Sequence, residues 1–555
     1  MRQSENEGLY VSGGRESRDG AKGLLGFLLG TVVFGVAYTQ PALYYSNQNQ
    51  YFLHGLAHGG FGFLDQDWLA RTADPTPVFS VLVAFTYRYL HEWFFYIYYL
   101  FILGVYLHAL AGLFTALSGG RPTACARLGF VTLLVALHSG LVRWASAQLF
   151  GVDYPWYFQA GVANQYVLGA GLQPSVFGVL LLLSVSAFLR DRPLSAATWS
   201  SLAAVMHSTY LLTATLLTLS YLFLLCREKR VRAALLVGAW ALLLVAPVLV
   251  YNLLTFAPSS AEEFAKAQYL LAHVRIPHHA LVERWLDGIA CAQLGWVLLA
   301  MYLVRGRRLF VILGMTFTLS LLLTLVQLGT GNDTLALLFP WRSSAILVPL
   351  ATAVVLTRVV NRVADWFPSP SLSRQRPTAF VCGVVLAIMT VGGASINYLG
   401  LGYRTNSQEL KLLGYIWEHK RSGEVYLLPV EVPTLTAGKR GAASLNFTPP
   451  PRRATQTQVI SVDLQRFRLF TGAPIYVDFK SIPYKDVEVL EWDERVRWNH
   501  ALYKQRDWDW EEIKTELDRR RITHVIATAD RDLRCEALEQ VYSDQFYRLY
   551  RVRSE

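Results

Sequence analysis

The chain has 555 residues, of which 53% are hydrophobic and only 16% carry a charge. A soluble domain usually has about 25% charged residues. The apolar residues gather in uncharged stretches, and about 20 such residues suffice to cross a bilayer. These uncharged stretches include residues 177–189, 233–251 and 310–328. The composition therefore excludes an ordinary soluble fold.

The net charge of +11 would also suit a nucleic-acid-binding protein. The basic residues, however, fall largely in short loops between apolar stretches, as cytoplasmic loops of membrane proteins do. We therefore predict membrane lipids as partners and no nucleic acid. The fold class that follows is mainly α, a polytopic transmembrane helical bundle.

Loop charges predict about eleven spans in a plasma or inner membrane, with a cytoplasmic N-terminus. Residues 1–23 form a polar, basic leader, and the transmembrane domain covers residues 24–400. The predicted spans are 24–38, 94–117, 128–150, one that ends at Arg190, two short helices within 196–226, and then 233–254, 289–304, 310–328, 343–356 and 380–398.

Residues 196–226 are the ambiguous part of this topology. Basic clusters flank them on both sides, at Arg190 and Arg192 and at residues 227–232. One long span would place one cluster outside, whereas two short helices that break near His207 keep both clusters inside. We favour the two-helix hairpin. A single span stays open and would invert the topology that follows it.

The sequence pattern of residues 401–555 predicts a soluble, extracytoplasmic α/β domain. Helical and strand patterns alternate there, and this alternation is typical of α/β folds. The predicted elements are helices at 409–420 and 508–521, strands at 424–429, 522–527 and 546–552, and a loop rich in Gly and Pro at 437–453.

The first extracytoplasmic loop, about residues 39–92, holds the candidate catalytic residues Asp65 and Asp67. In a turn or extended backbone, this spacing lets two carboxylates converge on one cation or one sugar hydroxyl. Alternatively, Asp65 caps a helix and Asp67 lies in its first turn. The same loop offers further polar candidates for acceptor binding, namely His54, His58 and Asp74.

Three arginines near the outer ends of spans are candidates for binding a donor phosphate, namely Arg143, Arg275 and Arg342. A cation in a span is costly and rarely faces lipid, and arginine binds phosphate through paired hydrogen bonds. Snorkelling to the interface is the alternative explanation. His278 and His279 are adjacent, so they could donate to an anion more easily than they could share a metal.

This pattern resembles the GT-C superfamily of membrane glycosyltransferases. The resemblance rests on Asp65-Gln66-Asp67 in the first outside loop, the break at His207, the outside C-terminal domain, and a tail similar to those of bacterial members, Arg521–Ile526 with Tyr547–Val552. It implies transfer of a sugar from a polyprenyl-phosphate donor to an extracytoplasmic acceptor.

In that resemblance, Asp65 or Asp67 would be the general base, and the other would orient the acceptor or a divalent cation, magnesium or manganese. Arg143, Arg275 or Arg342 would stabilise the departing phosphate. Many members carry an acidic residue soon after the first span, where this chain has Asn47-Gln48-Asn49-Gln50. A non-catalytic scaffold, a polysaccharide polymerase or ligase, and a transporter therefore stay open as alternatives. The lack of an internal repeat disfavours transport.

Overall fold

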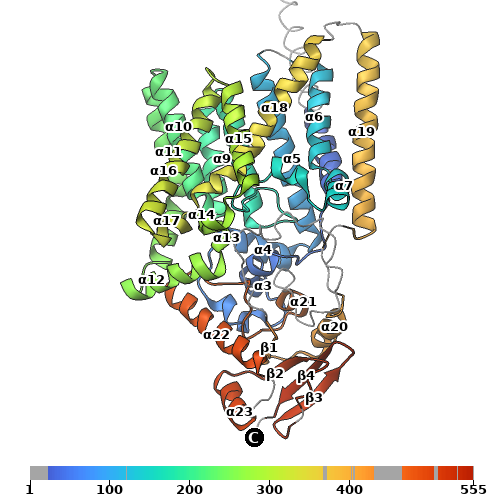
Figure 1. The fold of residues 1–555 in the computed structure, drawn as a ribbon, viewed down its shortest axis with the longest axis vertical. Coiled ribbons are helices and arrows are strands. Elements are labelled where there is room, and N and C mark those ends of the chain that lie inside the picture. The colour runs from blue at the N-terminus through green and yellow to red at the C-terminus, as the bar shows by residue number, and fades with distance from the viewer. Residues whose placement is uncertain are drawn as a thin grey trace, which may run out of the picture.

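The computed structural model describes residues 23–119, 122–366, 372–401, 403, 407–430, 466–505, 510–533 and 535–553. A bundle of helices forms one part of the molecule, and a smaller domain with a sheet is packed against one end of it (Figure 1). Most of the polar leader and the predicted loop at 437–453 lie outside the described residues.

Six helices in the described part of the chain are long and apolar enough to cross a membrane. They are α5 (Trp93–Leu117), Ser208–Arg227 including α10 (Leu211–Arg227), α11 (Val231–Thr255), α16 (Arg308–Thr330), Asp333–Asp365, which begins with α17 (Asp333–Leu337) and covers all but the last residue of α18 (Ser344–Trp366), and Arg376–Tyr398 within α19 (Leu372–Tyr398). Shorter apolar helices cover Gly23–Tyr38, Pro174–Leu189, which includes α8 (Val179–Leu189), and α15 (Gly288–Leu303).

A bent pair of helices, α6 (Ala124–His138) and α7 (Gly140–Phe150), makes a seventh span if the pair is counted as one. The two helices meet at an angle of 46°. Ser139 causes the break, because its backbone is extended and its hydroxyl caps the new helix by accepting from the N–H of Val142 at 3.3 Å. Length and composition thus support six or seven spans, and the predicted count of eleven stays a prediction.

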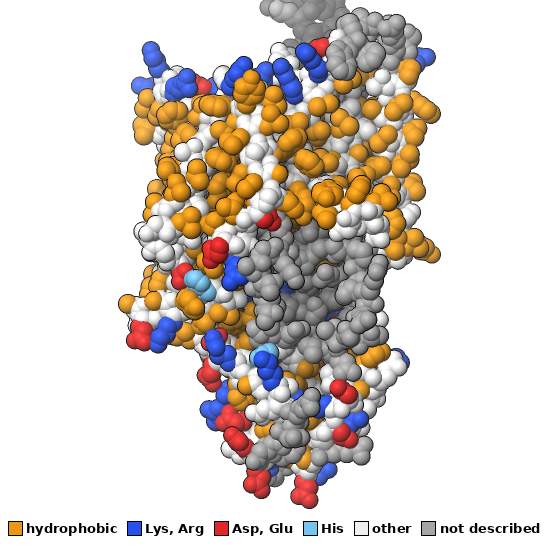
Figure 2. All heavy atoms as spheres, viewed as in Figure 1, with side chains coloured by type: hydrophobic (Ala, Val, Ile, Leu, Met, Phe, Trp, Pro, Cys, Tyr) orange, Lys and Arg blue, Asp and Glu red, His pale blue; other side chains and the backbone are white. Residues whose placement is uncertain are grey.

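The flank of the bundle is apolar, as expected for helices that face lipid. Figure 2 shows hydrophobic side chains along the whole height of the bundle and Lys and Arg gathered at the end far from the C-terminal domain. On α11, the side chains of Leu235, Leu242 and Leu253 are each more than 60% exposed. Apolar exposure on this scale marks a membrane-embedded surface in a multi-pass protein.

The ambiguous segment after Arg190 folds into two helices that leave one end of the bundle and return to it. α9 (Pro193–Met206) stops at His207, whose backbone is extended, and α10 follows after one turn. Arg230, after α10, donates to Asp191, before α9, at 2.5 Å. The predicted break at His207 is therefore confirmed, and both basic clusters lie at the same end of the bundle.

The C-terminal domain packs helices around a small mixed sheet with strand order β1-β2-β4-β3. The pair β1–β2 is parallel, and the other two pairs are antiparallel. Its elements are α20 (Leu410–His419), β1 (Tyr426–Leu427), α21 (Phe467–Thr471), α22 (Asp486–Lys504), α23 (Trp510–Arg519), β2 (His524–Thr528), β3 (Leu538–Ser543) and β4 (Tyr547–Val552). The sequence patterns did not predict α21, α22 or β3.

The first loop fills the junction between the bundle and the C-terminal domain. It folds into α2 (Gln48–Tyr51), α3 (Leu53–Gly59) and α4 (Pro77–Tyr89). The N–H of Phe63 donates to the carbonyl oxygen of Gly472 at 2.8 Å. This loop and the C-terminal domain therefore lie at the same end of the bundle, as Figure 1 also shows. Short helices from the other loops complete the junction, namely α12 (Ala261–Tyr269), α13 (Pro277–Ala280), α14 (Val282–Trp285) and α17 (Asp333–Leu337).

Candidate functional site

The two first-loop aspartates proposed as a catalytic pair have different surroundings. Asp65 is exposed in a single 3-10 turn. Asp67 is completely buried, and its Oδ1 accepts from the N–H of Leu69 at 2.9 Å. Its Oδ2 accepts from Nε of Arg468 at 2.7 Å and from the N–H of Ile475 at 2.9 Å. A buried carboxylate needs such partners, and they make Asp67 an anchor for the loop.

This arrangement does not fit the divalent cation that the resemblance implied. A magnesium or manganese ion needs several converging oxygen ligands. The lone pairs of Asp67 already face three N–H donors, and Asp65 is turned to solvent. Over the described ranges, no group of three or more His, Cys, Asp or Glu side chains is placed to hold a metal ion.

Arg143 also has a carboxylate partner that its sequence position did not reveal. It lies unexposed in α7, and its Nε and Nη2 donate to Oδ2 of Asp153 at 2.9 and 2.8 Å. Its guanidinium lies over the ring of Trp156 at 4.6 Å. Because separating a buried ion pair costs several kcal/mol, we exclude Arg143 from the candidate phosphate site.

Arg342 differs from Arg143, because two of its hydrogen-bond donors have no partner among the described residues. It belongs to the 3-10 turn Pro340–Ser343, and its guanidinium stacks on the ring of Tyr210 at 4.6 Å. Its Nη1 donates to the side-chain oxygen of Gln165. Its Nε and Nη2 are buried, with no hydrogen-bond partner in the part of the chain that the structure describes.

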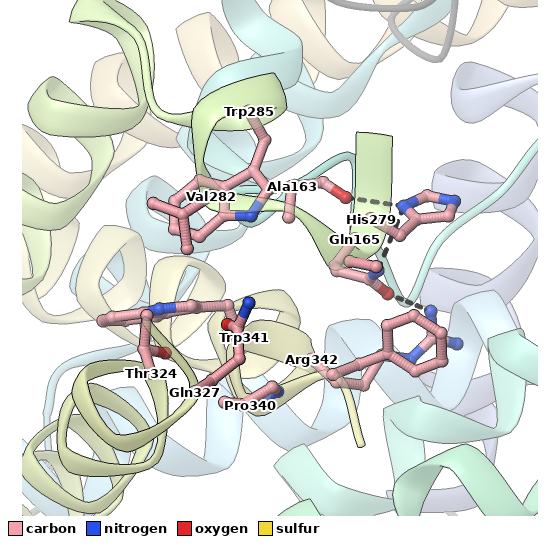
Figure 3. A pocket seen from close by; sticks show the side chains of 12 residues that line it. Ala163, Gln165, His279, Val282, Trp285, Thr324, Gln327, Pro340, Trp341 and Arg342 are labelled. Carbon is pink, nitrogen blue, oxygen red and sulfur yellow. Dashed lines mark hydrogen bonds between the residues drawn. The ribbon is translucent and has the colours of Figure 1, made fainter. Parts of the chain in front are cut away.

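Gln165 connects Arg342 to His279, as the dashed lines of Figure 3 show. The amide nitrogen of Gln165 lies 3.1 Å from Nδ1 of His279, and this ring nitrogen also bonds the carbonyl oxygen of Ala163 at 2.7 Å. Two of the predicted polar residues, Arg342 and His279, are thus brought together by a glutamine that the sequence did not single out.

A small pocket adjoins these three side chains. Trp285 and Trp341 face each other across it in Figure 3, and Thr324 and Gln327 of α16 supply polar groups to its wall. The free space between these side chains is about that of one water molecule. A phosphate would therefore enter only if side chains of the lining move.

Arg275 joins the same junction from the end of a π-helical turn, Leu270–Arg275. Its Nε donates to the carbonyl oxygen of Lys480 at 3.0 Å. The side chain of Lys480 is only 6% exposed, and its Nζ donates to the hydroxyl of Ser46 at 2.9 Å. The C-terminal domain thus inserts a lysine between the first loop and Arg275. We call Arg275, Arg342 and Lys480 the cation cluster.

The positive charges of the cation cluster contribute to lowering the pKa values of the two histidines beside it. Burial first, and then the charges of Arg342 and Arg275, lower the pKa of His279 to about 4. Burial also holds the pKa of His278 well below its usual range, with further lowering by His279, Arg275 and Lys480. Both rings are therefore neutral at pH 7, so they add no positive charge to that of the cation cluster.

Tyr51 links this cluster to a second small pocket. Burial raises its pKa, and the nearby charges of Arg342 and Arg275 oppose the rise. The lining of the second pocket is Gln50, Tyr51, His54, Leu69, Pro75, Thr76 and Ile482. Neither of these two pockets is lined by Asp65 or Asp67.

His54 is the histidine in the lining of this second pocket. Its Nε2 bonds the carbonyl oxygen of Thr72 at 3.2 Å. Burial lowers its pKa, whereas the charge of nearby Asp74 acts in the opposite direction. Asp74 itself accepts from the N–H of Thr76 at 2.8 Å. His58, the other histidine of α3, is exposed at the end of that helix.

The residues that sequence reasoning missed come mostly from distant segments. Lys480 approaches Ser46 across 434 positions, and nothing in its own neighbourhood marks it. The sequence around Gln165 weakly indicates a polar site. The loop has no Lys or Arg but contains three glutamines, Gln159, Gln165 and Gln173, and all three are buried. Buried amides in a loop point to an organised polar site.

Comparison with known proteins adds one short match. Residues 453–498 are similar to the family described as Domain of unknown function (DUF6798). The described part of this segment includes Arg468 and Lys480, which donate to Asp67 and Ser46 of the first loop, and Asp478, which accepts from Arg468. No curated protein matches the chain.

Proposed function

We propose that this protein transfers a sugar from a lipid-phosphate donor to an extracytoplasmic acceptor, at the junction of the bundle and the C-terminal domain. The observation that supports the proposal is the guanidinium of Arg342, which has two buried N–H donors with no hydrogen-bond partner among the described residues. Buried donors left without partners cost free energy. A phosphate placed there would accept from both, because it matches the planar fork of arginine.

The membrane orientation belongs to the same proposal. The end rich in Lys and Arg (Figure 2) is assigned to the cytoplasm. The cation cluster and the C-terminal domain are then extracytoplasmic, where a lipid-linked donor presents its phosphate. The shorter helices, with the α9–α10 pair, complete the eleven spans of the sequence prediction within a locally thin bilayer.

The chemistry is a substitution at the anomeric carbon of the donor. The acceptor hydroxyl oxygen forms a bond to that carbon, and the bond from the carbon to the phosphate oxygen breaks. The electron pair of the broken bond stays on the lipid phosphate, where Arg342 and Arg275 stabilise it, a contribution that is often the largest in catalysis. The hydroxyl proton must go to a base.

His54 fits the role of that base better than Asp67 does. The carbonyl of Thr72 favours a proton on Nε2, so that Nδ1 carries the lone pair. Burial keeps the ring neutral at pH 7, and the charge of Asp74 favours the protonated product. Asp65, exposed on its turn, is the alternative from the sequence.

Binding of farnesyl phosphate to the purified protein in nanodiscs tests the proposal, with tryptophan fluorescence as the signal because Trp285 and Trp341 line the cavity. We expect Arg342→Gln and Arg275→Gln each to weaken binding about tenfold or more. Farnesol, which lacks the phosphate, should bind all variants alike. Arg88→Gln is the matched control, since Arg88 is exposed in α4. Equal affinity in Arg342→Gln and the parent would refute the site.

A non-catalytic scaffold is the second candidate, favoured by the engagement of Asp67 in a buried ion pair. Transfer of radiolabelled sugar from a polyprenyl-phosphate donor separates the two. Transfer that is lost in His54→Gln, which keeps a donor for Thr72 but no basic nitrogen, supports the enzyme. Binding of farnesyl phosphate without transfer by the parent supports the scaffold.

A further inference from the structure

Lys480 is a cation that the C-terminal domain places between Ser46 of the first loop and Arg275, next to the pocket lined by Arg342 and His279 but not in its lining. Its side chain is 6% exposed and reaches Ser46 of the first loop. It lies close to another cation, since Arg275 bonds its carbonyl oxygen and both charges lower the pKa of His278. Like charges at a buried place disfavour each other, and a bound anion removes that cost.

A continuous set of hydrogen bonds holds this lysine in place. Asp67 accepts from Arg468 at 2.7 Å, and Arg468 also donates to Asp478. The other oxygen of Asp478, Oδ1, accepts from the N–H of Ser481 at 2.6 Å. These bonds fix the backbone on both sides of Lys480. All three of these side chains are at most 4% exposed, so the set is shielded from water.

We infer that this segment of the C-terminal domain delivers Lys480 as a third phosphate-binding cation, and that Asp67, Arg468 and Asp478 are positioning residues for it. The inference rests on the proposed function and deepens it, because it gives the C-terminal domain a part in recognising the lipid-linked phosphate. Arg468, Asp478 and Lys480 all lie within residues 453–498. In this chain, the function of residues 453–498 is then to supply the residues that complete an anion-binding site.

Charge substitution at residue 480 tests the inference, with farnesyl phosphate as the probe and the full-length protein in nanodiscs. Lys480→Met keeps the length of the side chain and removes its charge, and we expect the Kd to rise about tenfold or more. Lys480→Arg should restore most of the affinity. Lys504→Met is the control, because Lys504 is exposed at the end of α22. An unchanged Kd in Lys480→Met would overturn the inference.

The positioning role has its own readout in a double-mutant cycle. Asp67→Asn should raise the Kd for farnesyl phosphate in the parent and have no further effect in the Lys480→Met background. Its effect on the unfolding temperature should persist in both backgrounds. Equal effects of Asp67→Asn on the Kd in both backgrounds would show that Asp67 does not act through Lys480. If Lys480→Met and Arg342→Gln both bind farnesyl phosphate with the affinity of the parent, the proposed function fails. If only Lys480→Met does so, only this inference fails.

Discussion

Asp67 and Arg468 are 401 positions apart in the sequence and form a buried ion pair, with 2.7 Å between Oδ2 and Nε. Their side chains are 0% and 4% exposed. The first loop is thus joined to the C-terminal domain by charge as well as by backbone contact, and the second carboxylate, Asp478, shares the same arginine.

Asp67→Asn should destabilise the protein, whereas Asp65→Asn should not. Removing one partner of a buried ion pair leaves a charge without compensation, at a cost of about 3–5 kcal/mol. Asp65 is exposed, and its carboxylate makes no hydrogen bond or ion pair with other described residues. Unfolding followed by tryptophan fluorescence in detergent compares the two variants. Indistinguishable midpoints would show that the ion pair contributes little.

The membrane-spanning part of the fold was predictable because lipid leaves few solutions for an apolar chain. The charges that flank residues 196–226 predicted the turn at His207. The contact between Asp191 and Arg230 shows the reason, because both flanks lie at the same end of the bundle. Helix α22 was detectable as well, since Val489, Trp492 and Val496 have helical spacing and are buried. Strand β3 was not detectable, because Leu538 is its only buried residue.

The candidate site was predictable only in part. Arg275 and Arg342 stood out because a cation near a span end needs a reason. The same reasoning selected Arg143, and only the folded chain shows that Asp153 neutralises it. The Asp65-Gln66-Asp67 spacing suggested convergence, but a buried arginine from the C-terminal domain holds one member away from the other. Partners hundreds of positions apart leave no local pattern.

The two ends of the bundle should differ in access from outside the cell. In a chain whose five native cysteines are replaced, Ser407→Cys next to α20 should react with an impermeant maleimide in intact cells. Lys229→Cys, exposed at the end with the basic clusters, should react only after the membrane is opened. Protection of Ser407→Cys in intact cells would invert the proposed orientation.

Glu409 should make the stability of the protein fall as the pH rises from 4.5 to 7. It is unexposed, its Oε1 accepts from Nε of Arg466 at 2.6 Å, and its Oε2 has no hydrogen-bond partner within the described ranges. Burial raises its pKa from 4.5 to about 7, against the charge of Arg466, which lowers it. The folded state thus holds a proton that the unfolded state releases across this window.

The size of this effect follows from the shift in the pKa. The rise of the pKa from 4.5 to about 7 corresponds to about 3 kcal/mol of unfolding free energy, fully present below pH 4.5 and lost by about pH 7. Glu409→Gln cannot titrate, so its stability should lack this contribution. Denaturant unfolding at pH 5 and pH 8 measures the difference, with Glu418→Gln on the exposed face of α20 as the control. A parent and a Glu409→Gln variant with the same pH dependence would refute it.

Gly62→Ala should loosen the contact between the first loop and the C-terminal domain. Gly62 has a φ of +57°, which costs an alanine about 1 kcal/mol or more. An added Cβ would also lie 2.7 Å from the Cα of Gly472, and this neighbour is backbone that cannot rotate away. Such overpacking costs about 1–3 kcal/mol in addition, and it displaces the bond from Phe63 to Gly472.

Gly60→Ala separates the two contributions. Gly60 has a similar φ of +85°, but nothing lies within 4 Å of an added Cβ. It should therefore show the backbone cost alone, while Gly62→Ala shows the backbone cost and the clash. Unfolding midpoints measure both, and limited proteolysis of the first loop should accelerate only in Gly62→Ala. If the two variants lose the same stability and are cleaved at the same rate, the close approach of Gly62 to Gly472 does not hold the loop in place.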